Sequence, residues 1–176
     1  MKKNEQNILL VDDDHTLLTS LKRLLAINGY ECDIAAGGEE AICSLNHKAY
    51  DLLLLDLHMP HVNGHDVMQH IKGCEQKPTV VVVSGETSFE AARKACSGGS
   101  YAFLSKPYKT EELLTTVKNA LKEKQLKKQN LLMQKQLKES ERLHRYLVNT
   151  SPDIIYILDP QGNFTFINQR IESLLG

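Results

Sequence analysis

A run of four consecutive leucines, Leu52–Leu55, constrains the fold of this chain more than any other stretch. An uninterrupted apolar run of this length is typical of a strand buried on both faces, as in the interior of a parallel sheet. The run ends at a carboxylate, Asp56, and the turn residues Asn63 and Gly64 follow it. Open α/β sheets bind ligands at the carboxyl ends of their strands. We therefore predict that Asp56 lies in a site and is the residue that becomes chemically modified.

Other short apolar runs alternate with helical patterns along the first two thirds of the chain. Strands are predicted at residues 8–11, 32–35, 79–83 and 101–104, and helices around Leu17–Leu25, Ala41–Leu45, Val67–Ile71 and residues 89–95. Five strands separated by helices indicate an α/β fold with a parallel sheet covered on both faces. Right-handed crossovers and short loops favour a doubly wound, flavodoxin-like sheet with strand order 2-1-3-4-5.

In that strand order, the carboxyl ends of the first, third, fourth and fifth strands converge. The residues found there are Asp12, Asp13, Asp56, Ser84 and Lys106. Taken singly, each is an ordinary turn former or helix cap. No packing requirement accounts for three acids and a lysine at one edge of a sheet, so their joint placement predicts a functional site.

The predicted cluster suggests its own chemistry. Carboxylates this close repel one another unless a cation lies between them, and an oxygen-only ligand set favours Mg²⁺. Asp56 can then attack phosphorus and form an aspartyl phosphate. Lys106 adds positive charge, and the Ser84 hydroxyl can donate a hydrogen bond to a phosphoryl oxygen.

Four motifs together carry a family resemblance. They are Val11-Asp12-Asp13-Asp14, Leu55-Asp56-Leu57-His58-Met59-Pro60, Val83-Ser84-Gly85 and Phe103-Leu104-Ser105-Lys106-Pro107. From about Ile8 to Leu121 the chain resembles the receiver domain of two-component response regulators. The resemblance implies that Asp56 accepts a phosphoryl group from a histidine kinase or phosphotransfer protein. It also implies that the receiver catalyses only its own phosphorylation and dephosphorylation.

The resemblance further implies a Mg²⁺ site in which Asp13 and Asp56 are direct ligands and Asp12 acts largely through water. The main-chain carbonyl of His58 would be the third protein ligand. His58 is also bulky and ionisable, so its side chain is expected to affect the lifetime of the phosphate.

Three other residues take family roles by the same resemblance. Ser84 occupies the position of the switch hydroxyl, Phe103 that of the switch aromatic residue, and Lys106 would precede a cis peptide bond. On phosphorylation Ser84 would move inward, and Phe103 would rotate into the vacated space.

Two alternatives to the receiver interpretation stay open from the sequence. A Mg²⁺-dependent hydrolase that passes through an aspartyl phosphate, similar to haloacid-dehalogenase-like phosphatases, would use Asp12 and Asp14. These two acids have the two-residue spacing of that family, but the hydrolase leaves Asp56 and Ser84 unexplained. A degenerate receiver would act only as an interaction module. A transition-metal site among His58, His61, His65 and His70 is disfavoured, because no cysteine is near and Gly64 interrupts the pattern.

Residues 110–146 contain no glycine or proline and predict one long helix or two joined end to end. Beyond the part able to pack on the sheet, a heptad seam runs through Leu126, Asn130, Met133, Leu137, Ser140, His144 and Leu147. We expect a parallel coiled-coil homodimer, with a solvated connector helix as the alternative. The predicted domains are a receiver at 1–121, a linker at 122–146 and a third segment at 147–176.

The third segment predicts a hairpin of residues 154–158 and 164–167, joined by Asp159, Pro160, Gly162 and Asn163, with a helix starting at 168. It resembles the N-terminal part of a PAS sensory domain. A hairpin and one helix cannot enclose a core, so a longer protein is expected. Its output domain, a histidine kinase or diguanylate cyclase by analogy, would lie beyond Gly176.

Composition excludes several other classes of function. The 21 basic and 22 acidic residues balance, so no nucleic acid or anionic membrane partner is indicated. No apolar run approaches the roughly 20 residues of a membrane span, and the N-terminal residues lack an apolar signal core. The four cysteines form no CxxC pair and are expected to be reduced. We therefore expect a cytoplasmic protein.

Overall fold

The structure is a computed structural model that describes residues 6–85 and 99–172. The chain divides into two compact units, Met1–Leu126 and Lys127–Gly176. The first unit contains a five-stranded sheet, and the second contains a two-stranded one. The short helix predicted at residues 89–95 lies outside the described residues.

The sheet of the first unit is entirely parallel and has the order β2-β1-β3-β4-β5. Its strands are β1 (Ile8–Val11), β2 (Cys32–Ala35), β3 (Leu52–Leu55), β4 (Thr79–Ser84) and β5 (Ala102–Ser105). The predicted strand order is therefore confirmed. The four leucines of β3 are all buried, as expected for the central strand of a sheet covered on both faces.

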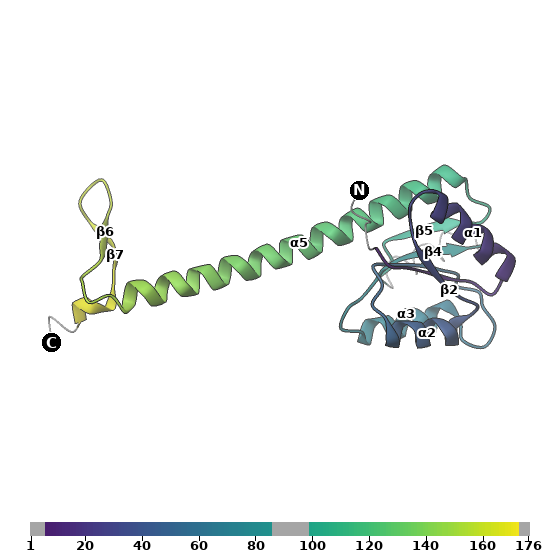
Figure 1. The fold of residues 1–176 in the computed structure, drawn as a ribbon, viewed down its shortest axis with the longest axis horizontal. Helices are drawn as coiled ribbons and strands as arrows, with labels where there is room; N and C mark the ends of the chain where they lie inside the picture. The colour runs from purple at the N-terminus through teal and green to yellow at the C-terminus, as the bar shows by residue number, and fades with distance from the viewer. Residues whose placement is uncertain (1–5, 86–98, 173–176) are drawn as a thin grey trace. The chain divides into compact units, whose positions relative to one another are not determined.

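Two layers of helices cover the sheet, as Figure 1 shows. The helices are α1 (His15–Ile27), α2 (Gly38–His47), α3 (Gly64–Gly73) and α5 (Thr110–Asn149). One core cluster joins α1 and the start of α5 to one face of the sheet, and a second joins α2 and α3 to the opposite face. Successive strand residues pack into opposite clusters: Leu54 belongs to the first, whereas Leu53 and Leu55 belong to the second.

The loop between β3 and α3 is held in place by its own sequence. The Asn63 side chain accepts hydrogen bonds from the first turn of α3, and the Asp66 carboxylate accepts one from the Asn63 backbone N–H, which forms a capping box. The Gly64 N–H donates to the Leu57 carbonyl at 3.1 Å. A Cβ on Gly64 would collide with the Asp56 carbonyl oxygen and lie 2.7 Å from the Leu57 Cα. Only glycine allows α3 to begin this close to the end of β3.

Helix α5 changes character along its length. Its first turns bury an apolar face against the sheet, formed by Leu113, Val117, Ala120 and Leu121. In the second unit the leucine and methionine side chains of this helix are exposed; Leu137, for example, is 62% exposed. None of the helices in the described parts of the chain is both long and apolar enough to cross a membrane.

The C-terminal hairpin consists of β6 (Tyr156–Leu158) and β7 (Phe164–Ile167), which pair antiparallel. Strand β6 is shorter than predicted because the buried Asn168 engages Ile155. The Asn168 side-chain oxygen accepts from the Ile155 N–H at 3.0 Å, and the backbone N–H of Asn168 donates to the Ile155 carbonyl at 2.9 Å. The predicted helix after residue 168 begins as the 3-10 turn η1 (Gln169–Ile171), and residues 173–175 lie outside the described part.

Gly64→Ala is expected to lower the free energy of unfolding by about 2 kcal/mol, because the new methyl group collides with the main chain of Asp56 and Leu57 just after β3. Urea denaturation measures the change. Gly73→Ala is the matched control at the other end of α3, where a Cβ meets nothing within 4 Å. It should cost little or stabilise slightly. Equal losses in the two variants would contradict the close approach at Gly64.

Candidate functional site

Strand register brings two acids together at the carboxyl edge of the sheet. Val11 of β1 pairs with Leu55 of β3. The next residues are Asp12 and Asp56, which therefore leave adjacent strands side by side. The Asp56 N–H continues the ladder by donating to the Val11 carbonyl at 2.9 Å. Both acids are buried, with 5% and 6% of their surfaces exposed.

Lys106 bridges these two acids. Ser84 of β4 pairs with Ser105 of β5, which places the following Lys106 at the same edge. Its Nζ lies 2.7 Å from Asp12 Oδ2 and 2.6 Å from Asp56 Oδ2. Burial alone would lower the pKa of the ammonium, but hydrogen bonds to the two carboxylates outweigh it, so the pKa is raised. Lys106 is thus charged at neutral pH. Its peptide bond to Pro107 is cis, as predicted.

The second oxygen of each buried carboxylate accepts a backbone hydrogen bond. Asp12 Oδ1 accepts from the Asp14 N–H at 2.9 Å, and Asp56 Oδ1 accepts from the His58 N–H at 3.0 Å. Each acid is thus held from two sides, by a turn of its own strand end and by Lys106. These contacts fix the orientation of both carboxylates.

A third acid completes a cluster suited to a cation. One oxygen each from Asp12, Asp13 and Asp56 lie within 4.8 Å of one another. Three carboxylates against the single ammonium of Lys106 leave two negative charges in excess. An oxygen-only donor set with this excess matches the preference of Mg²⁺. Within residues 6–85 and 99–172, no other group of three acidic, histidine or cysteine side chains is placed to share a metal.

Of the predicted switch residues, Ser84 ends β4 and Phe103 lies within β5. The Ser84 side chain is completely buried, and its Oγ lies 3.1 Å from Nδ1 of the exposed His58. Phe103 pairs with Val82 in the sheet and is only partly buried against the core cluster of α2 and α3. The contact between His58 and Ser84 was not predicted from the sequence, although His58 was singled out for its position two residues after Asp56.

The four histidines of the β3–α3 region do not gather into a site. His58 contacts Ser84, whereas the His70 ring lies 2.9 Å from Asn46 Oδ1 on α2. His61 adopts a left-handed conformation with φ of 61°, and both it and His65 are exposed.

Solved structures share the fold. A response regulator receiver domain protein (CheY-like) from Methanospirillum hungatei is 29% identical with a TM-score of 0.65, covering 69% of this chain and 98% of that one. The signal receiver domain of a putative Luxo repressor protein from Vibrio parahaemolyticus is 27% identical with a TM-score of 0.67, covering 70% and 95%. The fold and the edge cluster thus define a flavodoxin-like α/β protein with an acidic site at its strand ends.

The family model of the response regulator receiver domain matches residues 8–118, and the chain belongs to this family. A PAS domain model matches residues 142–176. Membership of the receiver family supports a role in two-component, phosphorylation-dependent signalling.

Curated relatives are longer than the matched region. The probable transcriptional regulator ycf29 of Porphyra purpurea is 30% identical over 130 residues, covering 73% of this chain and 62% of the relative. Response regulator MprA of Mycobacterium tuberculosis is 32% identical over 115 residues, covering 65% and 50%. The chain therefore spans about half to three fifths of the length of these relatives.

Lys106→Met is expected to destabilise the protein, because it leaves Asp12 and Asp56 side by side without their cation. We expect a loss of about 2 kcal/mol at pH 7, measured by urea denaturation. Folding raises the pKa of Lys106, so the stabilisation is fully present below the unfolded pKa of about 10.4. It is lost only as the pH rises through the folded value.

The matched control is Lys48→Met, which removes an ion pair of 2.7 Å with Asp33 in which both side chains are 47% exposed. An exposed pair contributes less than about 1 kcal/mol. If Lys106→Met lowers the free energy of unfolding no more than Lys48→Met does, then Lys106 does not stabilise the pair of Asp12 and Asp56.

Proposed function

We propose that this chain is a phosphorylation-dependent switch in which Asp56 accepts a phosphoryl group from a histidine kinase or a phosphotransfer protein. One observation carries the proposal: Asp12, Asp56 and Lys106, which are far apart in the sequence, meet within hydrogen-bonding distance at the strand ends. Membership of the receiver family supports it.

In this reaction an Asp56 carboxylate oxygen forms the new bond to phosphorus. The bond between phosphorus and the donor breaks, and the donor leaves with its electron pair. The main chain of His58 keeps the carboxylate oriented, and Lys106 places a positive charge beside the oxygen atoms of the transferred group. The Ser84 hydroxyl can donate a hydrogen bond to one of these oxygens once it is directed toward Asp56.

We propose Mg²⁺ as the cofactor, held by Asp12, Asp13 and Asp56 together with the main-chain carbonyl of His58. When bound, Mg²⁺ supplies positive charge that offsets the phosphoryl oxygens. The all-oxygen cluster with its excess negative charge supports this assignment. The role of the His58 carbonyl and the water-mediated role of Asp12 remain predictions.

The hydrolase alternative loses support from the place of Asp14. Its side chain caps α1, where Oδ1 accepts from the N–H groups of Thr16 and Leu17 at 2.8 and 3.1 Å. These hydrogen bonds lower the pKa of Asp14 and give it a structural role at the helix start. Asp14 is therefore not paired with Asp12 as a second catalytic acid. The complete cluster likewise argues against a degenerate receiver.

The signal would leave the receiver through α5. Val83 of β4 and Leu104 of β5 share one core cluster with Leu113 and Val117 of α5. Ser84 and Phe103 directly adjoin Val83 and Leu104 in the chain, so a change at these two residues can reach α5 through β4 and β5, although Phe103 itself packs on the opposite face of the sheet. We propose that α5 conveys the change toward the PAS segment and an output domain.

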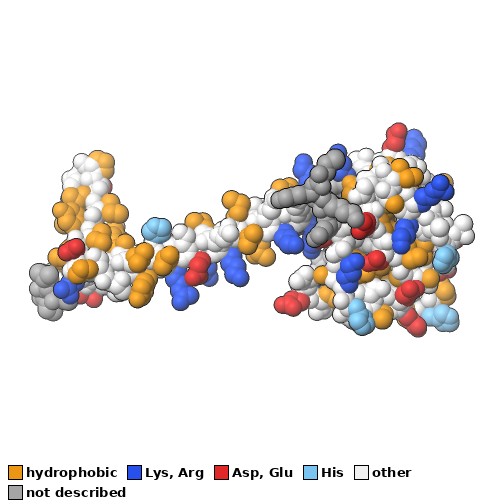
Figure 2. All heavy atoms as spheres, viewed as in Figure 1, with side chains coloured by type: hydrophobic (Ala, Val, Ile, Leu, Met, Phe, Trp, Pro, Cys, Tyr) orange, Lys and Arg blue, Asp and Glu red, His pale blue; other side chains and the backbone are white. Residues whose placement is uncertain are grey.

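The exposed part of α5 supports a parallel homodimer with a second copy of the chain. Figure 2 shows apolar and basic side chains interspersed along this helix. On the seam, the side chains of Met133 and Leu137 are 66% and 62% exposed. None of the seven seam residues is an aspartate, glutamate, lysine or arginine. A second copy would bury these side chains, and Asn130 would set the register.

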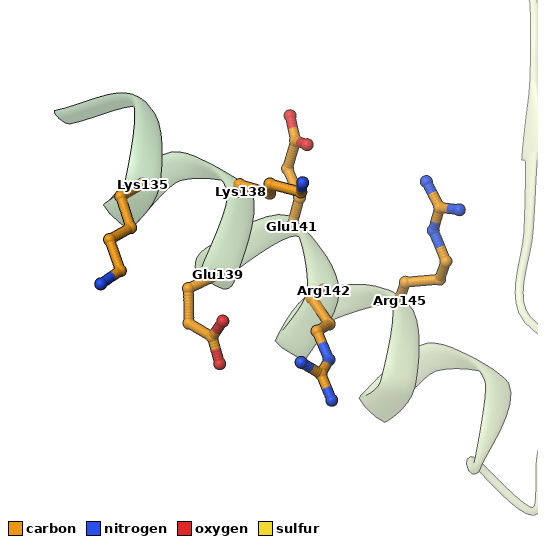
Figure 3. A pocket seen from close by; sticks show the side chains of 6 residues that line it. All are labelled: Lys135, Lys138, Glu139, Glu141, Arg142 and Arg145. Atoms are coloured by element: carbon orange, nitrogen blue, oxygen red, sulfur yellow. The ribbon is translucent and has the colours of Figure 1, made fainter. Parts of the chain in front are cut away.

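The charged residues of this helix agree with that seam. Figure 3 shows the side chains that line a surface pocket, all of which come from α5: Lys135, Lys138, Glu139, Glu141, Arg142 and Arg145. In the heptad with Leu137 at an a position, all of them except Glu141 fall at the outer b, c and f positions. Their charges would therefore remain in water when two helices associate.

Incubation with acetyl phosphate and Mg²⁺ should attach one phosphoryl group per chain, detected by intact-protein mass spectrometry. Asp56→Asn should abolish labelling because the nucleophilic oxygen is lost. Asp14→Asn is the matched control, since asparagine still caps α1 and labelling should persist. Phosphate turnover that survives Asp56→Asn would favour the hydrolase, and absence of both labelling and Mg²⁺ binding would favour an interaction module.

Leu137→Lys should weaken the homodimer at least about tenfold, because it places a charge in the seam. Sedimentation equilibrium of the full chain measures the dissociation constant. Leu132→Lys is the matched control: Leu132 is similarly exposed on α5 but lies at a c position, outside the seam. A monomeric parent chain, or equal weakening by both substitutions, would contradict the proposed dimer.

A further inference from the structure

The buried Ser84 hydroxyl is held by a residue that also contacts the phosphoacceptor. Ser84 is completely buried at the end of β4, where a hydroxyl without a hydrogen bond would be costly. Its Oγ lies 3.1 Å from Nδ1 of His58. The residue that supplies this contact comes from another strand end, because His58 follows β3.

His58 therefore connects two parts of the site. Its main-chain N–H donates to Asp56 Oδ1 at 3.0 Å, whereas its imidazole reaches Ser84. The turn that orients the carboxylate thus also determines where the ring lies. His58 is exposed, so its side chain can leave Ser84 without opening the core.

We propose that His58 is a positioning residue that latches Ser84 in the unphosphorylated protein. This inference rests on the proposed function of Asp56. The latch assigns His58 the tautomer that carries no proton on Nδ1, so that Ser84 donates its hydroxyl proton to this nitrogen and the same proton is not available to a phosphoryl oxygen. Binding of a phosphoryl group requires Ser84 to exchange the ring nitrogen for that oxygen. The imidazole thereby opposes the phosphorylated state.

The effect expected from the latch is modest and has a definite sign. A neutral hydrogen bond of this kind corresponds to roughly a threefold to tenfold change in an equilibrium constant. Removing the ring nitrogen should therefore strengthen binding of a phosphoryl group by about fivefold. If the ring instead oriented Ser84 toward the phosphoryl group, removing the ring nitrogen would weaken binding.

The test is calorimetric titration of the full chain with beryllofluoride, an unreactive mimic of a phosphoryl group, in the presence of Mg²⁺. The bulky ring could also slow hydrolysis by shielding the phosphate from water. Such shielding does not affect an equilibrium binding constant, so the titration reports the latch alone. His58→Leu removes the nitrogen and leaves an apolar side chain that cannot accept a hydrogen bond, so this variant should bind about fivefold more tightly. His58→Asn places an amide oxygen near the position of Nδ1 and should restore the parent affinity.

Each substitution is repeated in a Ser84→Ala background to complete a double-mutant cycle. Without the Ser84 hydroxyl, His58→Leu should no longer change the affinity. Unchanged or weaker binding by His58→Leu, or the same gain in both backgrounds, would overturn the latch. A parent chain that binds no beryllofluoride and is not labelled at Asp56 would instead overturn the proposed function, and the latch with it.

Discussion

The ion pairs of one lysine with two carboxylates from different strands dominate the carboxyl edge of this sheet. Asp12 and Asp56 lie side by side because their strands are in register, and at low local dielectric two adjacent carboxylates repel strongly. Lys106 relieves that repulsion from a third strand end. With Asp13 included, the cluster still has an excess of negative charge. This excess lowers the stability of the fold and provides a suitable environment for a divalent cation.

Rigid and adjustable parts of the site are separated. Asp56 is anchored by the ladder to β1, by the turn at His58 and by the tight start of α3 at Gly64. Its neighbours are less constrained: Ser84 is held partly through an exposed imidazole, and Phe103 is only partly buried. A fixed acceptor beside side chains with alternative arrangements is the combination that a two-state switch requires.

Sequence reasoning predicted the scaffold well because its signals are local. Four leucines followed by Asp56 indicated a buried strand with an acid at its end, and the strand order followed from general rules of connection. It was less accurate for the bounds of β6 and the turn after β7, where a buried polar residue determines the backbone hydrogen bonds. Asn168 binds the backbone of Ile155, so β6 starts at Tyr156, and the following turn is 3-10. Nothing in the local pattern marked Asn168 as buried. The linker dimer, the Mg²⁺ site and the domain limits remain predictions.

The sequence by itself determined which elements form and that acids, a hydroxyl and a lysine follow particular strands, since burial periodicity is a property of neighbouring residues. Only the tertiary structure decided which of these groups touch. Lys106 is 94 residues from Asp12 and 50 from Asp56, and His58 is 26 residues from Ser84. Such pairs meet only when parallel register aligns the strand ends and packing selects each side-chain conformation.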